Sequence, residues 1–134
     1  MTKFIKRFTE WLMFKSKLDG KNHLPPLFSE QEVWWCAIGE NVGIEISGKG
    51  DYFRRPVLII RKLDAYSFIG MPLTRTIRNG TWYGQVTVNG SLNTVIMAQV
   101  RHYDYRRLDK RLCVIRDDEF NRVLESYTSL FVRK

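Results

Sequence analysis

The sequence is poor in the residues that build metal centres and disulfide frameworks. Its 134 residues include two cysteines and two histidines. Cys36 and Cys113 each lie inside an apolar run rather than in a metal-spaced pair, which indicates buried free thiols in a reducing cytosol. His23 and His102 lie far apart in the chain. We therefore expect no metal site and no cofactor, and this composition argues against a metal hydrolase.

The sequence also lacks an apolar run of the kind that crosses a membrane or directs secretion. Charged residues interrupt the apolar residues near the N-terminus, namely Lys6, Arg7, Glu10, Lys15 and Lys17. We therefore predict a cytoplasmic protein that does not enter a membrane.

Acidic residues are outnumbered by basic ones. The 22 lysines and arginines exceed the 14 acidic residues and give a net charge of +8. Residues 45–80 hold seven basic and three acidic side chains, so half of the excess lies in this segment. This concentration favours a polyanionic partner such as nucleic acid, with an ordinary solvated basic surface as the alternative.

The N-terminal part of the chain is expected to be separate from the main domain. Apolar residues at helical spacing predict an amphipathic helix over residues 2–18, with an inner face of Phe4, Ile5, Phe8, Trp11 and Leu12. Glycine and proline residues between 19 and 26 predict a linker. The expected division is a helix and linker over residues 1–26 and a domain over residues 27–134, long enough to bury its own core. The helix is expected to pack on that domain or on a second copy, with membrane or calmodulin-like binding as the alternative.

The main domain reads as short strands joined by tight turns. Strands are predicted over residues 32–38, 56–63, 67–73, 81–88, 92–98 and 111–115. Asn89-Gly90 is typical of a two-residue hairpin turn. A C-terminal helix is predicted to begin at capping residues Asp117 and Asp118 and to run to about residue 131. Five or six strands without crossover helices predict a mainly β fold, a strongly bent antiparallel sheet or small barrel.

One predicted hairpin is expected to organise the functional site. Asp64-Ala65 separates two apolar runs, and a turn centred there places Arg55 directly opposite Thr74. Directly opposed residues share a face of the sheet, with Cβ atoms about 4.5 to 5.5 Å apart. A change of register by one residue would break this pairing.

Short motifs in a fixed order extend this pattern from about residue 31 to residue 131. They are Glu32-Val33-Trp34-Trp35, Gly43-Ile44-Glu45, Arg55-Pro56-Val57-Leu58-Ile59, Pro72-Leu73-Thr74 and Ala98-Gln99-Val100-Arg101, followed by Asp104 and Arg107-Leu108. Together they resemble the MazF/PemK toxins of type II toxin–antitoxin systems. The resemblance implies an SH3-like barrel with added helices, a homodimer and a cognate antitoxin protein as partner. It also implies sequence-selective cleavage of single-stranded RNA without a metal or cofactor.

By the same resemblance, Arg55 and Thr74 match the family's catalytic arginine and its threonine or serine. Attack of a 2′-hydroxyl on the neighbouring phosphate needs proton transfer and hydrogen-bond donors for the charged phosphorane. Arg55 suits the donor role because its planar fork binds phosphate oxygens in pairs, and Thr74 can add a hydroxyl. The resemblance implies the arginine, here Arg55, as acid and base, and Glu45 and His102 are the other candidates for proton transfer. A salt bridge from Glu45 to Arg55 and a surface position for His102 are the preferred interpretations.

Residues on either side of this pair are expected to bind the RNA. The basic ones are Lys49, Arg54, Arg75 and Arg78, and the aromatic ones that offer stacking faces are Tyr52 and Phe53. Solvated charges, and rings that plug the loop when RNA is absent, are the alternatives.

Two features depart from the family pattern, namely a longer loop at 46–54 and the N-terminal helix. The RNA preference of the family therefore does not carry over to this chain. Two other functions also remain open: a relative that poisons a topoisomerase by binding it, and an SH3-like module that binds RNA or protein without cutting. The endoribonuclease is favoured because Arg55 and Thr74 are both present and compatible in register.

Overall fold

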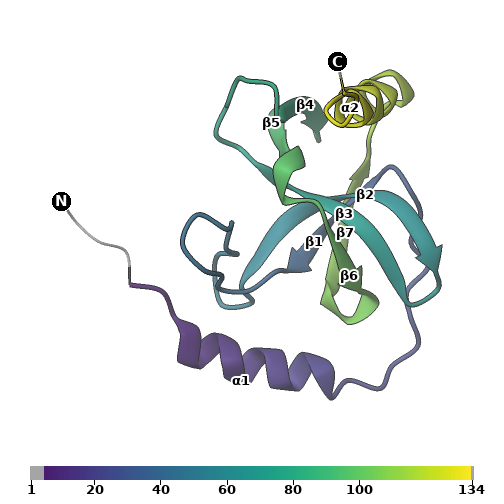
Figure 1. Ribbon diagram of the computed structural model, residues 1–134. Coiled ribbons are helices and arrows are strands. Elements are labelled where there is room, and N and C mark those ends of the chain that lie inside the picture. Colours follow the sequence, from purple (N-terminus) through teal and green to yellow (C-terminus); the bar gives the residue numbers. More distant parts are fainter. Residues whose placement is uncertain (1–4, 134) are drawn as a thin grey trace.

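A computed structural model describes residues 5–133 of the chain as a curved antiparallel sheet with two α-helices (Figure 1). The strands are β1 (Glu32–Ala37), β2 (Arg54–Asp64), β3 (Ser67–Thr74), β4 (Tyr83–Val88), β5 (Ser91–Ile96), β6 (Arg101–Asp104) and β7 (Leu108–Val114). The α-helices are α1 (Phe8–Asp19) and α2 (Asp117–Ser129), and short 3-10 helices are η1 (Met97–Gln99) and η2 (Tyr105–Arg107).

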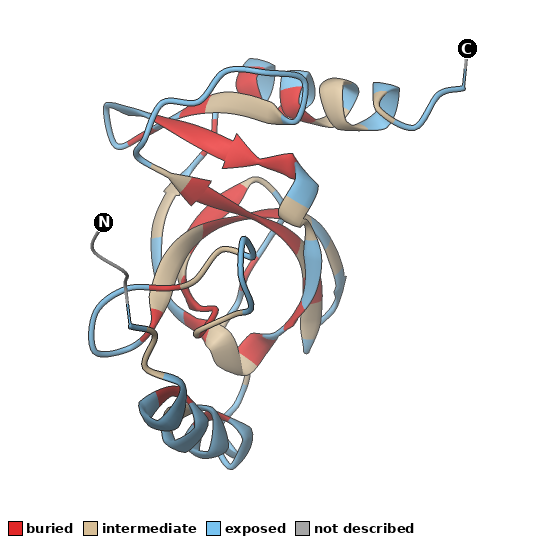
Figure 2. Cartoon of the chain, turned by 60° about the vertical axis from the view of Figure 1, so that its left-hand side comes forward, coloured by how far each residue is buried: buried red, intermediate tan, exposed pale blue. Residues whose placement is uncertain are grey.

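The sheet curls around a buried interior without closing into a barrel. Its strand order is β4-β5-β3-β2-β1-β7, and β6 also pairs with β3. Figure 2 shows α2 across one end of the curled sheet and α1 against the opposite end. The prediction of a mainly β fold with two flanking helices is therefore confirmed, and its barrel description is only loosely correct. The strand that sequence reasoning missed is β6, because a four-residue strand with a single buried side chain, Tyr103, has no apolar alternation to detect.

Two apolar clusters fill the interior. The cluster beneath α2 joins Phe120 and Val123 of the helix to Leu58 and Val86 of the sheet. The other cluster lies beneath β6 and includes Phe28, Phe68, Tyr103 and Ile59. Full burial of side chains of this size stabilises a fold by roughly 1.5 to 3 kcal/mol each, so these clusters hold the curvature of the sheet.

The start of α2 differs from the sequence prediction. Arg116 is the N-cap residue, and no side chain caps the helix there. Asp117 and Asp118 lie in the first turn, where Asp117 accepts a hydrogen bond from Gln31 and Asp118 pairs with Arg116 at 2.9 Å. Their negative charge still favours the helix, because the helix dipole is positive at its N-terminus.

The inner face of α1 agrees with the prediction at Trp11 but not at its other described residues. Trp11 and Leu18 are buried and Phe14 is half-buried, whereas Phe8 and Leu12 are 51% and 67% exposed. The correct stripe is the one that meets Phe53 and Ala37. The predicted contribution of Phe4 lies outside the described residues. No helix within residues 5–133 is long and apolar enough to cross a membrane.

The register of the β2–β3 hairpin is confirmed next to the site and shifts near the turn. The ladder runs from Val57 opposite Pro72 to Ile59 opposite Gly70, as predicted. Two irregularities then shift the pairing, and the turn lies at 65–66, one residue later than predicted. The ladder between these strands ends at Val57 and Pro72, which leaves the preceding residues of β2 free to diverge from β3.

Candidate active site

Arg55 is held by the backbone of two different segments. Its Nε donates to the carbonyl oxygen of Ser47 at 3.0 Å, and its Nη1 donates to that of Leu73 at 3.5 Å. Both acceptors are neutral, and no ion pair among residues 5–133 involves Arg55. The predicted salt bridge from Glu45 is therefore wrong. The guanidinium keeps an uncompensated positive charge, since two carbonyls orient it and no carboxylate neutralises it.

The loop that supplies Ser47 is ordered by its own hydrogen bonds. The Ser47 hydroxyl accepts from the backbone N–H of Asn41 at 2.9 Å, and the N–H of Gly48 donates to the carbonyl of Gly39 at 2.7 Å. A Cβ at Gly48 would collide with the backbone of Phe53. Gly48 thus allows the close backbone packing that fixes the neighbouring carbonyl, the one that orients Arg55.

Arg55 and Thr74 line the same cavity. Thr74 ends β3, is half-buried, and accepts a hydrogen bond from the N–H of Thr76 at 3.2 Å. The cavity measures about 300 Å³, and its other polar lining residues include Lys49, Arg54 and Arg75. The direct cross-strand pairing predicted for the two residues does not form, because the β2–β3 ladder ends at Val57 opposite Pro72, in the predicted register but two residues short of them. The structure nevertheless brings the two side chains to one opening in the surface.

The electrostatics at Arg55 favour an anion. Burial lowers the pKa of the Arg55 guanidinium, and the positive charge of Arg78 lowers it further. Arg78 is exposed and is positioned through its backbone N–H, which donates to the Thr94 hydroxyl at 3.1 Å. A phosphate group bound in the cavity reduces the repulsion between these two cations.

A second cavity adjoins Arg55 on the side of the loop. It measures about 620 Å³ and is lined by Arg55, Lys49 and Glu45 together with the N-terminal residues Lys6 and Arg7. The Glu45 carboxylate accepts a hydrogen bond from the N–H of Val42 at 2.9 Å. Glu45 therefore faces the surroundings of Arg55 without pairing with it.

The structure does not bring His102 to this site. His102 is exposed on β6, opposite Ile69 of β3. Its neighbours Arg101 and Tyr103 line a different cavity, so His102 points to the other face of the strand. Ile69 and Thr74 are five positions apart on β3, a separation of about 17 Å along an extended strand.

The aromatic residues of the loop do not form the predicted pair of stacking faces. Phe53 is 3% exposed and packs against Trp11 of α1, with ring centroids 5.4 Å apart. The prediction that Phe53 stacks on a base is therefore wrong. Tyr52 is exposed, but it contacts Phe14 and lines a cavity on the α1 side of the molecule.

The two arginines expected to flank the pair have different surroundings. Arg54 forms an ion pair with Asp109, and its guanidinium lies 4.7 Å from the ring centre of Trp35. Arg75 is exposed and lines the Arg55–Thr74 cavity. Trp35 also lines that cavity, and sequence reasoning did not assign it to the site. The sequence did contain a signal for this role of Trp35. Trp34 is buried, and neighbouring residues of a strand point to opposite faces of the sheet, so Trp35 points away from the side on which Trp34 packs.

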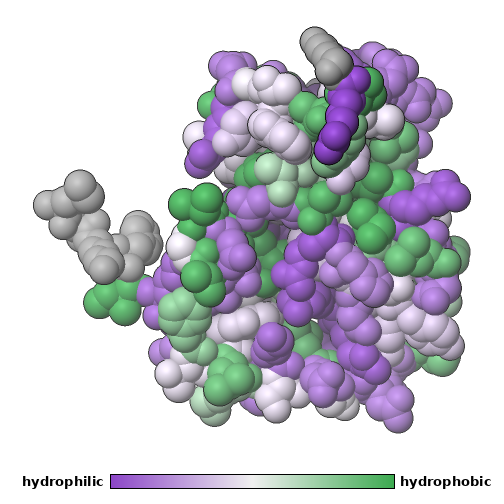
Figure 3. All heavy atoms as spheres, viewed as in Figure 1, coloured by the Kyte–Doolittle hydropathy of each residue, from purple (hydrophilic) through white to green (hydrophobic). Residues whose placement is uncertain are grey.

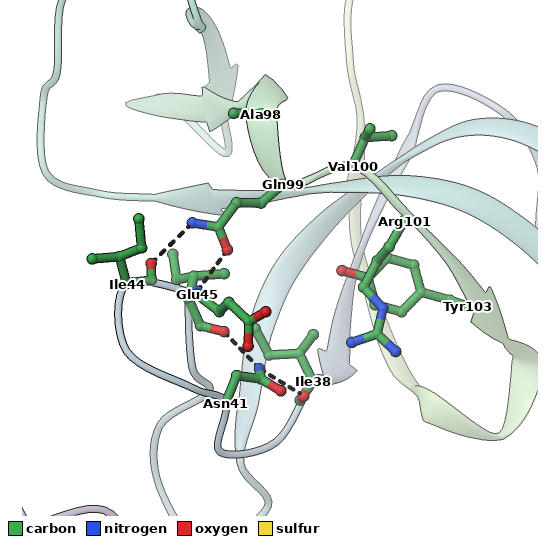
Figure 4. Close-up of a pocket in the computed structure, with 10 residues that line it drawn as sticks. Ile38, Asn41, Ile44, Glu45, Ala98, Gln99, Val100, Arg101 and Tyr103 are labelled. Atoms are coloured by element: carbon green, nitrogen blue, oxygen red, sulfur yellow. Dashed lines mark hydrogen bonds between the residues drawn. The ribbon is translucent and has the colours of Figure 1, made fainter.

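Gln99 fastens the loop to the opposite side of the sheet. Its side-chain oxygen accepts from the N–H of Ile46 at 2.6 Å, and its amide nitrogen donates to the carbonyl of Ile44 at 3.3 Å (Figure 4). These bonds cross a cavity of about 510 Å³, towards which Arg101 and Tyr103 project from β6. Figure 3 shows this face of the molecule, where hydrophilic side chains cover the lower centre. Among residues 5–133, no group of three or more His, Cys, Asp or Glu side chains could hold a metal ion.

The fold is shared with solved MazF structures and with a solved endoribonuclease. A MazF crystal structure from Deinococcus radiodurans matches with a TM-score of 0.63 at 20% identity, covering 81% of this chain and 97% of that one. An endoribonuclease from a mycobacterial species, solved with its cognate antitoxin, matches with a TM-score of 0.62 at 15% identity, over 81% of this chain and 99% of that one. A MazE–MazF structure from Deinococcus radiodurans gives 0.60 at 15% identity, over 84% and 100%. At these identities the likeness establishes the fold.

The sequence defines the family. Residues 29–131 match the model of the PemK-like, MazF-like toxins of type II toxin–antitoxin systems. The chain belongs to this family, and the resemblance noted from its motifs is confirmed. No curated protein matches the chain by direct sequence comparison.

Proposed function

We propose that the protein is a sequence-selective endoribonuclease that cleaves single-stranded RNA without a metal ion. The observation that carries this proposal is the placement of Arg55 and Thr74 on one open cavity, with the arginine charge left uncompensated. A cation oriented by neutral carbonyls is suited to a phosphate whose negative charge grows during reaction. Family membership supports the same activity.

The proposed reaction is transfer of a phosphoryl group within the RNA. The 2′-oxygen attacks the adjacent phosphorus while the bond from phosphorus to the 5′-oxygen of the next nucleotide breaks. The 2′-hydroxyl proton passes to a base, and the departing 5′-oxygen gains a proton. The products are a 2′,3′-cyclic phosphate and a 5′-hydroxyl, so no water is consumed in this step.

Each residue has a role that its surroundings allow. Arg55 donates to the phosphate oxygens with the N–H groups that Ser47 and Leu73 do not occupy, and Thr74 donates its hydroxyl. Two groups can exchange protons with the reacting oxygens, namely Arg55, whose pKa is lowered by burial and then by Arg78, and Glu45 across the adjoining cavity. Lys49, Arg75 and Arg78 bind flanking phosphates.

Two protein partners belong to the proposal. A second copy of the chain forms a homodimer, and a cognate antitoxin binds the basic face and blocks the RNA. The support is family membership in type II toxin–antitoxin systems, together with solved relatives captured with antitoxins. Light scattering of the purified protein tests the dimer. The antitoxin part predicts a small acidic open reading frame immediately upstream whose co-expression relieves toxicity, and the absence of such a frame or unrelieved toxicity would contradict that part.

The decisive experiment measures cleavage by Arg55 variants. Purified protein is incubated with a long unstructured RNA in EDTA, and new 5′ ends are mapped for the wild type, Arg55→Ala and Arg61→Ala. Arg61 also lies on β2 but is exposed and paired with Glu30 at 3.6 Å, so its removal matches the charge change away from the site. We expect discrete cuts that Arg61→Ala retains and that Arg55→Ala loses by about 100- to 1,000-fold. Intact RNA with the wild type would overturn the nuclease and favour a binding module.

A further inference from the structure

The N-terminal segment lies across the loop that orients Arg55. The Lys6 ammonium donates to the carbonyls of Asn41 at 2.6 Å and Gly43 at 3.1 Å. The Arg7 guanidinium donates to the carbonyl of Gly50 at 2.8 Å. These bonds reach both limbs of the loop, the one that leaves β1 and the one that enters β2. The segment thus links the two limbs of the loop by hydrogen bonds.

The helix that follows anchors this segment to the domain. Trp11 is buried, and its ring occupies the space where a Cβ of Gly39 would lie. The Trp11 ring also packs against Phe53, and the Arg107 guanidinium lies 5.8 Å from the centre of the Trp11 ring. Because Trp11 sits one turn beyond Arg7, its burial holds the basic pair in place over the loop.

Lys6 and Arg7 add positive charge to the cavity beside Arg55. Both line the 620 Å³ cavity together with Arg55 and Lys49. Their side chains donate to neutral carbonyls, and no ion pair among residues 5–133 involves either of them. Glu40, which also lines the cavity, accepts from the backbone N–H of Arg7 rather than from its guanidinium.

The two cavities next to Arg55 share part of their lining. Arg55, Lys49 and Gly50 line both the 300 Å³ cavity that contains Thr74 and the 620 Å³ cavity that contains Lys6 and Arg7. A strand that runs from Thr74 past Lys49 would reach the N-terminal pair. The larger cavity is lined by four cationic side chains and by two carboxylates, those of Glu40 and Glu45, so positive charge predominates there.

We propose that the N-terminal segment is part of the RNA site, with Lys6 and Arg7 binding backbone phosphates of the strand outside the cleaved linkage. This inference rests on the proposed function, and it assigns a substrate-binding role to a segment that lies before the family match at residues 29–131. The contact recognises the phosphodiester backbone and is independent of base identity. It lengthens the bound strand beyond the nucleotides that contact Arg55 and Thr74.

The test measures how binding depends on salt, using an RNA that cannot be cleaved. A fluorescein-labelled, single-stranded 2′-O-methyl oligonucleotide of mixed sequence lacks the attacking hydroxyl. Its dissociation constant is measured by anisotropy over a range of salt concentrations for the full-length wild type and a Lys6→Gln, Arg7→Gln double variant. Loss of two phosphate contacts should reduce the slope of log affinity against log salt by about 1.4, since each contact to a single strand contributes about 0.7.

Matched variants separate the local contact from net charge and from folding. Lys15→Gln with Lys17→Gln removes the same charge from exposed positions of α1 that do not line the cavity, and should keep the wild-type slope. Lys6→Arg with Arg7→Lys keeps both charges and should also keep it, while thermal melting checks that each variant is folded. Equal slopes for all four proteins would overturn the inference, and so would tighter binding by the Lys6, Arg7 variant, which would mark the segment as an inhibitory cover. Failure of the wild type to bind this RNA would instead count against the proposed function.

Discussion

Arg55 of β2 and Thr74 of β3 face one cavity although they are not partners in the sheet. The two strands separate at Val57 and Pro72, where Pro56 and Pro72 have no N–H to continue the ladder. Beyond that point β3 pairs with β5 and β2 continues along β1. The space left between the diverging strands is the candidate active site, and the hydrogen bond from Arg55 to the Leu73 carbonyl spans it.

The first prediction tests which of His102, Glu45 and Arg55 transfers protons during cleavage. His102→Gln should leave the cleavage rate within about twofold of the wild type, because this side chain lies on the far face of β6. Glu45→Gln keeps the acceptor for the Val42 N–H and removes the charge. If Glu45 is the base, the single-turnover rate falls by about 100- to 10,000-fold. A rate near that of the wild type would assign proton transfer to Arg55.

The second prediction concerns Arg54 and Arg75, which line the same cavity as Arg55. Arg75→Ala should reduce the salt dependence of RNA binding by about 0.7 in the log–log slope, because this exposed side chain faces the cavity. Arg54→Ala should change the slope less, because Asp109 already neutralises Arg54. Anisotropy with the uncleavable oligonucleotide gives both values. A larger effect at Arg54 than at Arg75 would contradict the prediction.

The third prediction tests the contact between α1 and the loop. Gly39 has a φ of +87° and no space for a Cβ beneath Trp11, whereas Gly43 has a φ of +55° and open space. Gly43→Ala should lower the free energy of unfolding by about 1 to 2 kcal/mol from backbone conformation alone. Gly39→Ala should cost more, roughly 3 kcal/mol or above, because Trp11 must also move. Urea denaturation measures both, and equal losses would show that the Trp11 contact is unimportant.

The fourth prediction is a pH dependence of stability. Burial raises the pKa of the Cys36 thiol from 9.0 to about 12, and the charges of Arg107 and Arg101 oppose this only in part. The folded protein thus keeps a proton that the unfolded chain releases above pH 9. Stability from this thiol is complete below that pH and falls as the pH rises towards 12, by about 1.4 kcal/mol per pH unit. Cys36→Ala should reduce the loss of stability above pH 9 in urea titrations, leaving the part that comes from Tyr103, whose pKa is also raised by burial. Parallel curves for both proteins would contradict the prediction.

Much of the fold follows from local patterns. Asn89-Gly90 predicted a hairpin turn, and both residues adopt the positive φ that such a turn requires. The apolar periodicity of residues 120–130 predicted the helix that covers one end of the sheet. These features were readable because each depends on residues close together in the sequence.

Other features depend on distant partners. The sequence of α1 offers two apolar stripes, and the stripe through Phe8 and Leu12 is as apolar as the one through Trp11 and Phe14. Packing against Phe53 selects the second stripe, and it also buries the ring that had been expected to stack on RNA. The same limit applies to Glu45, which was expected to pair with Arg55 but whose carboxylate binds the Val42 N–H.

Motifs and periodicity along the chain were enough to predict the family, the mainly β architecture and Arg55 and Thr74 as the pair to examine. How that pair meets depends on contacts between distant segments. Two register irregularities in the β2–β3 hairpin compensate for a turn that lies one residue later than predicted. Prolines end the β2–β3 ladder, and β3 then pairs with β5. Each of these is settled by packing between segments far apart in sequence, where local preference is too weak to choose.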